Sequence, residues 1–158
     1  MSLDRARDHL ARFGRADDVI VTAHSSATVE LAAQALGVAP QRIAKTLSFR
    51  GPEPDTAILV VLAGDARLDN AGFKQAFGLK ARMLGGEDVQ RLTGHEPGGV
   101  CPFGNPSSAT VWLDTSLQRF DSVFPACGDA ASAIELTCDE LETVARPAGW
   151  VTVSRLPD

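Results

Sequence analysis

Residues 94–104 read GHEPGGVCPFG, with four glycines and two prolines among eleven residues. Glycine has no Cβ, so a ligand can approach its backbone closely, while proline keeps the loop stiff. A stiff loop with free N–H groups is able to hold a carbonyl oxygen or a phosphate without a side-chain nucleophile. The segment therefore predicts a functional loop, against the plainer alternative of an irregular connection between two elements.

A second unusual feature is a lysine within a strand-like segment, residues 43–49 (IAKTLSF). Side chains of a strand alternate between two faces, so Lys45 falls on the apolar face together with Leu47 and Phe49. A lysine on an apolar face needs an anion, a cleft or a route to water. Two interpretations stay open: the ammonium group points into a pocket, or it reaches from the strand end into solvent.

The order of these motifs resembles that of the YbaK/EbsC family, also called the prolyl-tRNA synthetase-associated domain. Shorter matches surround the lysine strand and the glycine loop, namely residues 28–33 (TVELAA), 92–94 (LTG), 112–114 (WLD), 126–128 (ACG) and 134–136 (IEL). The resemblance runs over roughly residues 15–153, and the length predicts one domain over residues 1–158. The resemblance implies a free-standing trans-editing enzyme that deacylates mischarged aminoacyl-tRNA, most of all a small amino acid on proline tRNA.

The sequence contains no recognisable triad and no metal-ligand spacing, so hydrolysis would depend on positioning and electrostatics. The expected catalytic groups are Lys45 and the backbone N–H groups of Gly98, Gly99 and Val100. The lysine would bind the phosphate of the terminal adenosine or the developing oxyanion. The loop amides would hold the ester carbonyl or orient a water molecule.

The resemblance also implies a set of substrate-binding residues: His24, Thr46, Pro102, Phe103, Gly104 and Gly128. Thr46 belongs to the Lys-Thr pair of the family pattern, although alternation places Thr46 and Ser48 on the face opposite Lys45. After Gly128 the chain reads DAAS at residues 129–132, where some relatives carry basic residues. This departure leaves open the subfamily and the amino acid that is edited.

Other chemistry has weaker support. Cys101 lies in the glycine loop near His95, but free cysteines are usually small buried residues, so a thiol nucleophile is the less favoured alternative. Cys101, Cys127 and Cys138 lack the pair spacing of a zinc site. No Gly-Lys-Ser/Thr follows the glycines, which argues against a P-loop. We expect neither a metal nor a cofactor.

Composition narrows the class of protein. The 158 residues are 44% hydrophobic and 22% charged, as in one soluble domain with a sizeable core. The three cysteines without C-x-x-C spacing and the charged N-terminus predict a cytoplasmic protein with no membrane partner. A net charge of −5 argues against nonspecific nucleic-acid binding and against a DNA partner.

The resemblance implies contact with the acceptor end of aminoacyl-tRNA, and the net charge predicts that this contact is at best weak, local and salt-sensitive. An aminoacyl-tRNA synthetase that delivers the tRNA is a further expected partner. The alternative to an enzyme is a non-catalytic tRNA- or synthetase-binding module of the same fold.

Periodicity and cap signals predict helices at residues 2–13, 25–36, 69–77, 87–92 and 137–144. Strands are expected at residues 19–24, 43–49, 57–63, 79–84, 110–113, 122–124, 134–136 and 150–153. Both turns and helices join the strands, with no regular βαβ rhythm. The pattern predicts a mixed α/β fold with a largely antiparallel, barrel-like sheet flanked by helices, as does the family resemblance.

Overall fold

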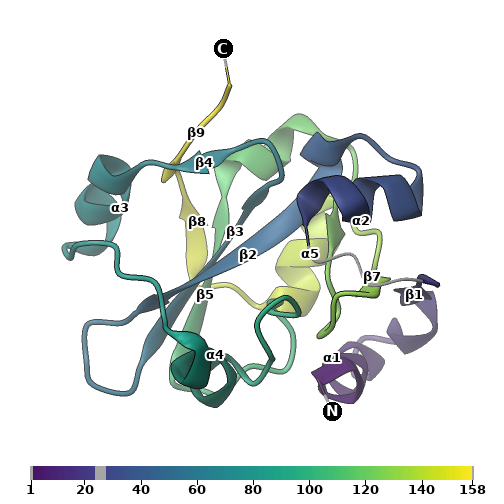
Figure 1. The fold of residues 1–158 in the computed structure, drawn as a ribbon, viewed down its shortest axis with the longest axis horizontal. Helices are drawn as coiled ribbons and strands as arrows, with labels where there is room; N and C mark the ends of the chain where they lie inside the picture. The colour runs from purple at the N-terminus through teal and green to yellow at the C-terminus, as the bar shows by residue number, and fades with distance from the viewer. Residues whose placement is uncertain (1, 24–27, 158) are drawn as a thin grey trace.

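The computed structural model describes residues 2–23 and 28–157. A five-stranded sheet in the order β6-β2-β3-β5-β8 lies at its centre, with two small sheets, β1-β7 and β4-β9, beside it (Figure 1). The main sheet consists of β2 (Ile43–Arg50), β3 (Ala57–Ala63), β5 (Ala109–Asp114), β6 (Phe124–Pro125) and β8 (Gly149–Val151). The small sheets consist of β1 (Ile20–Val21), β4 (Arg67–Leu68), β7 (Ser132–Ala133) and β9 (Ser154–Arg155).

The described helices are α1 (Ser2–Ala11), α2 (Val29–Leu36), α3 (Asn70–Phe77), α4 (Gly86–Thr93) and α5 (Cys138–Ala145). In Figure 1, α3 and α4 lie toward one end of the main sheet, and α1 and α2 toward the other. The predicted capping box starts α5, where the Thr137 side chain accepts from the Glu140 N–H and the Glu140 carboxylate accepts from the Thr137 N–H.

The strand β3 forms the centre of the core. All seven of its residues are apolar and buried, because β2 and β5 pair with its two edges and both of its faces are covered. The main hydrophobic cluster around it extends from Ala6 in α1 to Val153 near the C-terminus. Within the described part of the chain, no helix is long and apolar enough to span a membrane.

The predicted mixed α/β class is confirmed. Antiparallel pairing forms the longest ladder, β2–β3, and both small sheets, while β6, β5 and β8 join the main sheet through shorter parallel ladders. Most predicted elements occur, with ends shifted by a few residues. The helix expected from residue 25 begins at Val29 after the N-cap Thr28, and residues 24–27 lie outside the described part.

Two predicted strands are wrong. Residues 79–84 form one bridge, between Met83 and Phe49, because this segment meets β2 only briefly before α4 begins. Residues 134–136 likewise form one bridge, to Val123. Alternating apolar residues are present in both segments, but a strand also needs a partner along its whole length.

Candidate functional site

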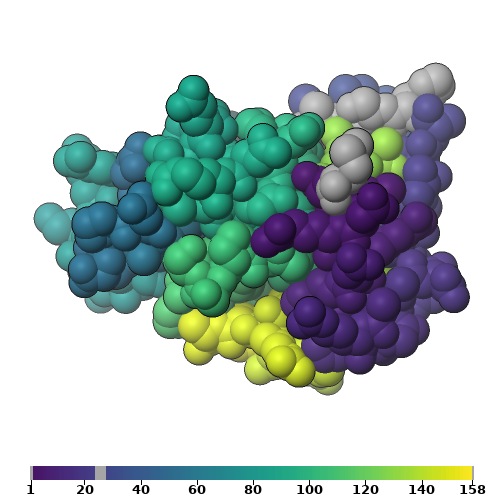
Figure 2. Space-filling view, turned by 90° about the horizontal axis from the view of Figure 1, so that it is seen from below, coloured from purple at the N-terminus to yellow at the C-terminus, as the bar shows by residue number. Residues whose placement is uncertain are grey.

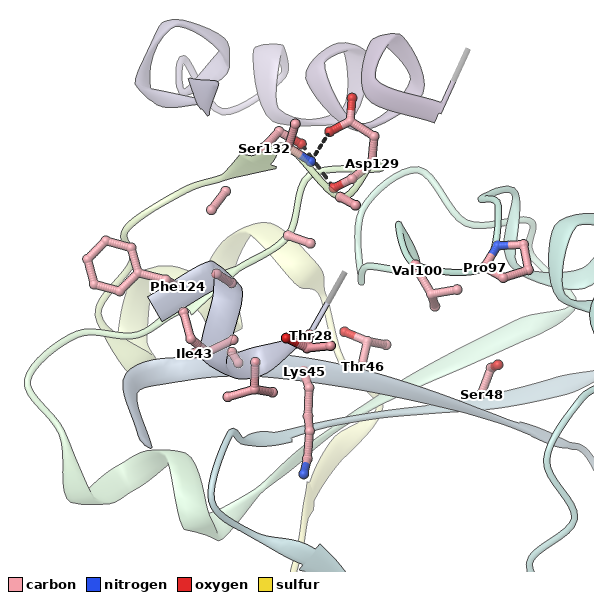
Figure 3. Close-up of a pocket in the computed structure, with 18 of the residues that line it drawn as sticks. Thr28, Ile43, Lys45, Thr46, Ser48, Pro97, Val100, Phe124, Asp129 and Ser132 are labelled. Carbon is pink, nitrogen blue, oxygen red and sulfur yellow. Dashed lines mark hydrogen bonds between the residues drawn. The ribbon is translucent and has the colours of Figure 1, made fainter. Parts of the chain in front are cut away.

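A cavity of about 300 Å³ lies beside β2, bordered by α2, the glycine loop and residues 126–133 and open to solvent (Figure 3). This volume is at the small end of the range for ligand pockets. The wall toward α2 and β6 is apolar and includes Leu36, Ile43 and Phe124. The cavity therefore has room for a small ligand with an apolar side.

The outer edge of β2 is open at the cavity. On the side away from β3, β6 pairs only with residues 43–44, and residues 82–84 approach β2 again from Ser48 to Arg50. The Ser48 carbonyl accepts from Leu84 N–H at 3.1 Å on this side. Backbone groups of alternate residues point to the same edge, so those of Thr46 also point there. In the described chain, no strand pairs with β2 on this edge at residues 45–47.

Two hydroxyl side chains point from β2 into the cavity, those of Thr46 and Ser48 (Figure 3). Ser48 is only 5% exposed. Neither hydroxyl forms a hydrogen bond with any residue in the ranges 2–23 and 28–157. Both hydroxyls face the cavity, so they are available to hydrogen-bond a ligand or water bound there.

Lys45 also lines the cavity, but its ammonium group points elsewhere. Its Nζ donates to the carbonyl oxygens of Ala66 at 2.6 Å and Gly64 at 3.3 Å. Figure 3 shows the side chain leaving β2 on the side opposite Thr46. Neither interpretation left open by the sequence describes this arrangement, because the ammonium group points away from the cavity and is held by carbonyl oxygens instead of water. An ammonium group has three donors, so one N–H remains for a further partner.

The turn that holds Lys45 is itself fixed by an ion pair. Asp65 lies between Gly64 and Ala66, and Arg119 donates to its two carboxylate oxygens at 2.5 and 3.1 Å. These hydrogen bonds lower the Asp65 pKa. Burial lowers the pKa of Lys45, and the Asp65 charge acts in the opposite direction. The ion pair thus orients the turn, and the Asp65 carboxylate partly offsets the effect of burial on the Lys45 pKa.

The glycine loop contains a type II turn at residues 96–99. Pro97 and Gly98 occupy its two central positions, Gly98 has a φ of 92°, and Gly99 N–H donates to the Glu96 carbonyl at 2.9 Å. The predicted role of the Gly99 amide is therefore corrected, because the turn already uses this donor. The amides of Gly98 and Val100 have no acceptor in the described part of the chain, and both residues line the cavity.

Gly99 instead allows the glycine loop to pack closely against residues 128–129. A Cβ added to Gly99 would lie 2.4 Å from the Gly128 carbonyl oxygen and 2.8 Å from the Asp129 Cα. Gly128 has a φ of 97°, and a Cβ there would meet the Ser2 carbonyl at 2.1 Å. The two glycines allow the loop, residues 128–129 and α1 to pack in direct backbone contact.

Four predicted binding residues do not line the cavity: Pro102, Phe103, Gly104 and Gly128. Phe103 is fully buried in the main core. Gly104 joins the loop to α1, because its N–H donates to His9 Nδ1 at 3.0 Å and its carbonyl accepts from Arg5. Figure 2 shows α1, in purple, lying against a teal and green surface formed by residues from the middle of the sequence. The predicted residue His24 lies outside the described residues.

The buried Cys101 is unsuited to act as a nucleophile. Burial raises the pKa of its thiol to about 12, so the thiol stays protonated at neutral pH. Its Sγ lies 3.4 Å from His95 Nε2, and that nitrogen lies 2.6 Å from the Phe103 carbonyl. Burial lowers the pKa of His95. Among the residues that the structure describes, no group of His, Cys, Asp and Glu could hold a metal ion.

Residues 126–133 form one wall of the cavity, and none of the four alanines in this wall was predicted from the sequence as a site residue. Ala126, Ala130, Ala131 and Ala133 all line it. Their small side chains leave space between this wall and β2. The run of small residues after Gly128 was the available signal, but its position opposite β2 depends on the fold.

Residues 23–144 match the model of the aminoacyl-tRNA editing domain. The chain belongs to this family. The family resemblance predicted from the lysine strand and the glycine loop is thereby confirmed. The uncharacterised protein YwhH of Bacillus subtilis (strain 168) is 52% identical over 155 residues, which cover 98% of each chain.

Two further similar proteins have names that refer to proline–tRNA ligase or prolyl-tRNA synthetase. A stretch of 92 residues, 57% of the chain, is 30% identical to proline–tRNA ligase of Desulfitobacterium hafniense, of which it covers 16%. A solved structure described as a proposed trans-editing enzyme for prolyl-tRNA synthetase has a TM-score of 0.86 at 28% identity, covering 98% of this chain and 97% of that one. The hypothetical protein APE2540 has a TM-score of 0.83 at 26% identity, covering 96% and 99%.

Proposed function

We propose that this protein hydrolyses the ester bond of mischarged aminoacyl-tRNA, with the amino acid bound in the cavity beside β2. One observation carries the proposal. A small cavity is lined by two loop residues whose amides have no acceptor in the described part of the chain, Gly98 and Val100, and by two residues whose hydroxyls have no partner there, Thr46 and Ser48. Membership of the aminoacyl-tRNA editing family supports the same reaction class.

In the proposed reaction, a water molecule attacks the ester carbonyl carbon and the carbonyl oxygen becomes negatively charged. The amides of Gly98 and Val100 donate to this oxygen, and a donor of this kind is worth about 10²- to 10³-fold in rate. The bond between the carbonyl carbon and the ribose oxygen then breaks. The ribose oxygen takes a proton that the attacking water has lost, and the amino acid leaves as an acid that ionises in solvent.

Lys45 is proposed to bind the phosphate of the terminal nucleotide. Two of its donors are engaged with the turn at residues 64–66, and the third is available to a phosphate oxygen. The direction of the side chain favours the phosphate role over contact with the oxyanion, because the ammonium group leaves β2 on the side opposite Thr46.

The proposed substrate is a small amino acid on proline tRNA. The cavity volume of about 300 Å³ supports a small amino acid, and the similarity to part of a proline–tRNA ligase supports the tRNA. The net charge of −5 favours contact limited to the acceptor end, with an aminoacyl-tRNA synthetase as a partner that delivers the tRNA.

A panel of mischarged proline and non-proline tRNAs tests the proposal. We expect the ester of at least one small amino acid on proline tRNA to disappear faster with the protein than in buffer. Lys45→Ala is expected to weaken tRNA binding and slow deacylation, and Lys45→Arg to retain part of both. Hydrolysis by Lys45→Ala at the parental rate would show that Lys45 is not part of the site. Binding of tRNA with no hydrolysis of any ester would instead support the non-catalytic binding module.

A further inference from the structure

We infer that the amino acid removed at this site carries a side-chain hydroxyl group, and that Ser48 and Thr46 select it. The inference rests on the function proposed above and adds to it the chemistry of the substrate. Serine and threonine are the amino acids of this class, and alanine is the comparison that lacks only the hydroxyl.

The first support is geometric. Thr46 and Ser48 are two positions apart on one strand, so their side chains share a face and are separated by about 6.6 Å along β2. Both point into the cavity (Figure 3). A small polar side chain between the loop and the strand would lie within reach of one or both hydroxyls.

The second support is that other polar groups of the cavity are already engaged. The Thr28 hydroxyl accepts from Leu31 N–H at the start of α2. The Ser132 hydroxyl donates to the Asp129 carbonyl at 3.4 Å, and the Asp129 carboxylate accepts from Ala131 N–H at 2.9 Å.

Thr46 and Ser48 therefore differ from these neighbours, since neither hydroxyl has a partner within the described residues.

The third support is the apolar surroundings of the two hydroxyls. Pro97 and Val100 lie on the loop side of Thr46 and Ser48 in Figure 3, and Leu84 also lines the cavity.

Hydrogen bonds are more selective where apolar groups exclude water, because an analogue without the hydroxyl leaves the protein group unpaired. A purely apolar pocket would discriminate weakly between alanine and serine. The observed pair of hydroxyls thus favours the hydroxylated amino acid.

The test compares single-turnover hydrolysis of seryl, threonyl and alanyl esters on the same proline tRNA. We expect the parent protein to hydrolyse the better of the two hydroxylated esters at least about 10-fold faster than the alanyl ester. Ser48→Ala and Thr46→Val should together reduce this ratio to near one. Ser132→Ala is the matched control, since its hydroxyl lies at the same cavity but is already bonded, and it should keep the ratio of the parent.

The outcomes separate the inference from the function on which it rests. Hydrolysis of all three esters at similar rates by the parent would overturn the inference and leave the deacylase function intact. A ratio that survives both β2 substitutions in folded protein, checked by circular dichroism, would also overturn it. If the parent hydrolyses no ester in the panel, the proposed function itself fails.

Discussion

Gly99→Ala is expected to impair the site without removing any functional side chain. The added Cβ would lie 2.4 Å from the Gly128 carbonyl oxygen, whereas ordinary contacts begin at 3.4 Å. The atoms it meets are backbone, so the loop and residues 128–129 must separate by about 1 Å. A displacement of about 1 Å in a positioned site lowers the rate by about 10²-fold, which is the loss of kcat/KM that we expect.

The assay is steady-state deacylation of the best ester found in the panel, with thermal unfolding measured in parallel. Overpacking of this kind destabilises proteins by about 1–3 kcal/mol, so the variant should still fold. Gly86→Ala is the matched control, because its Cβ would meet no atom within 4 Å at the start of α4. A folded Gly99→Ala protein with the parental kcat/KM would refute the idea that contact between these two segments shapes the site.

Three further predictions concern titratable groups. Asp65→Asn removes a charge that raises the Lys45 pKa, so the alkaline limb of the pH profile of kcat/KM should move to lower pH. An unmoved limb would show that Asp65 does not influence the function of Lys45. Burial lowers the pKa values of His9 and His95 below 6.5, so below that pH the unfolded chain binds more protons than the folded protein. The melting temperature should therefore decrease as the pH is lowered from about 7 to about 5, and it should decrease less steeply in His9→Gln. Cys101→Ser and treatment with a chelator should each leave deacylation within about tenfold of the parent, since the thiol is protonated and buried; a loss of several orders of magnitude would restore the nucleophile or zinc interpretation.

The parts of the fold that could be predicted are those fixed by local sequence. The seven apolar residues of β3 could only be a buried strand, and Thr137 and Glu140 form a capping box through neighbours in the chain. Residues 79–84 show the limit of this reasoning. Their alternation is that of a strand, but their pairing depends on how long they run beside β2, which is set by the start of α4.

The elements that form the candidate site could be predicted from the sequence, but the directions in which its side chains point could be predicted only in part. Alternation correctly placed Lys45 and Thr46 on opposite faces of β2, but the carbonyl oxygens that hold the lysine come from a turn about twenty residues away, which no local pattern reveals. The Glu-Pro-Gly-Gly sequence at residues 96–99 is typical of a type II turn. That signal could have shown in advance that the Gly99 amide is used within the loop.

The central claim is that the amides of Gly98 and Val100, which have no acceptor among the described residues, hold the carbonyl group of an aminoacyl ester. Nuclear magnetic resonance of ¹⁵N-labelled protein tests it directly, with an aminoacyl adenosine whose ester is replaced by a stable amide as the probe. We predict saturable shifts of the Gly98 and Val100 amide resonances, and smaller shifts for Gly99, whose N–H is bonded to Glu96. Saturable binding that leaves the Gly98 and Val100 resonances unmoved would contradict the account.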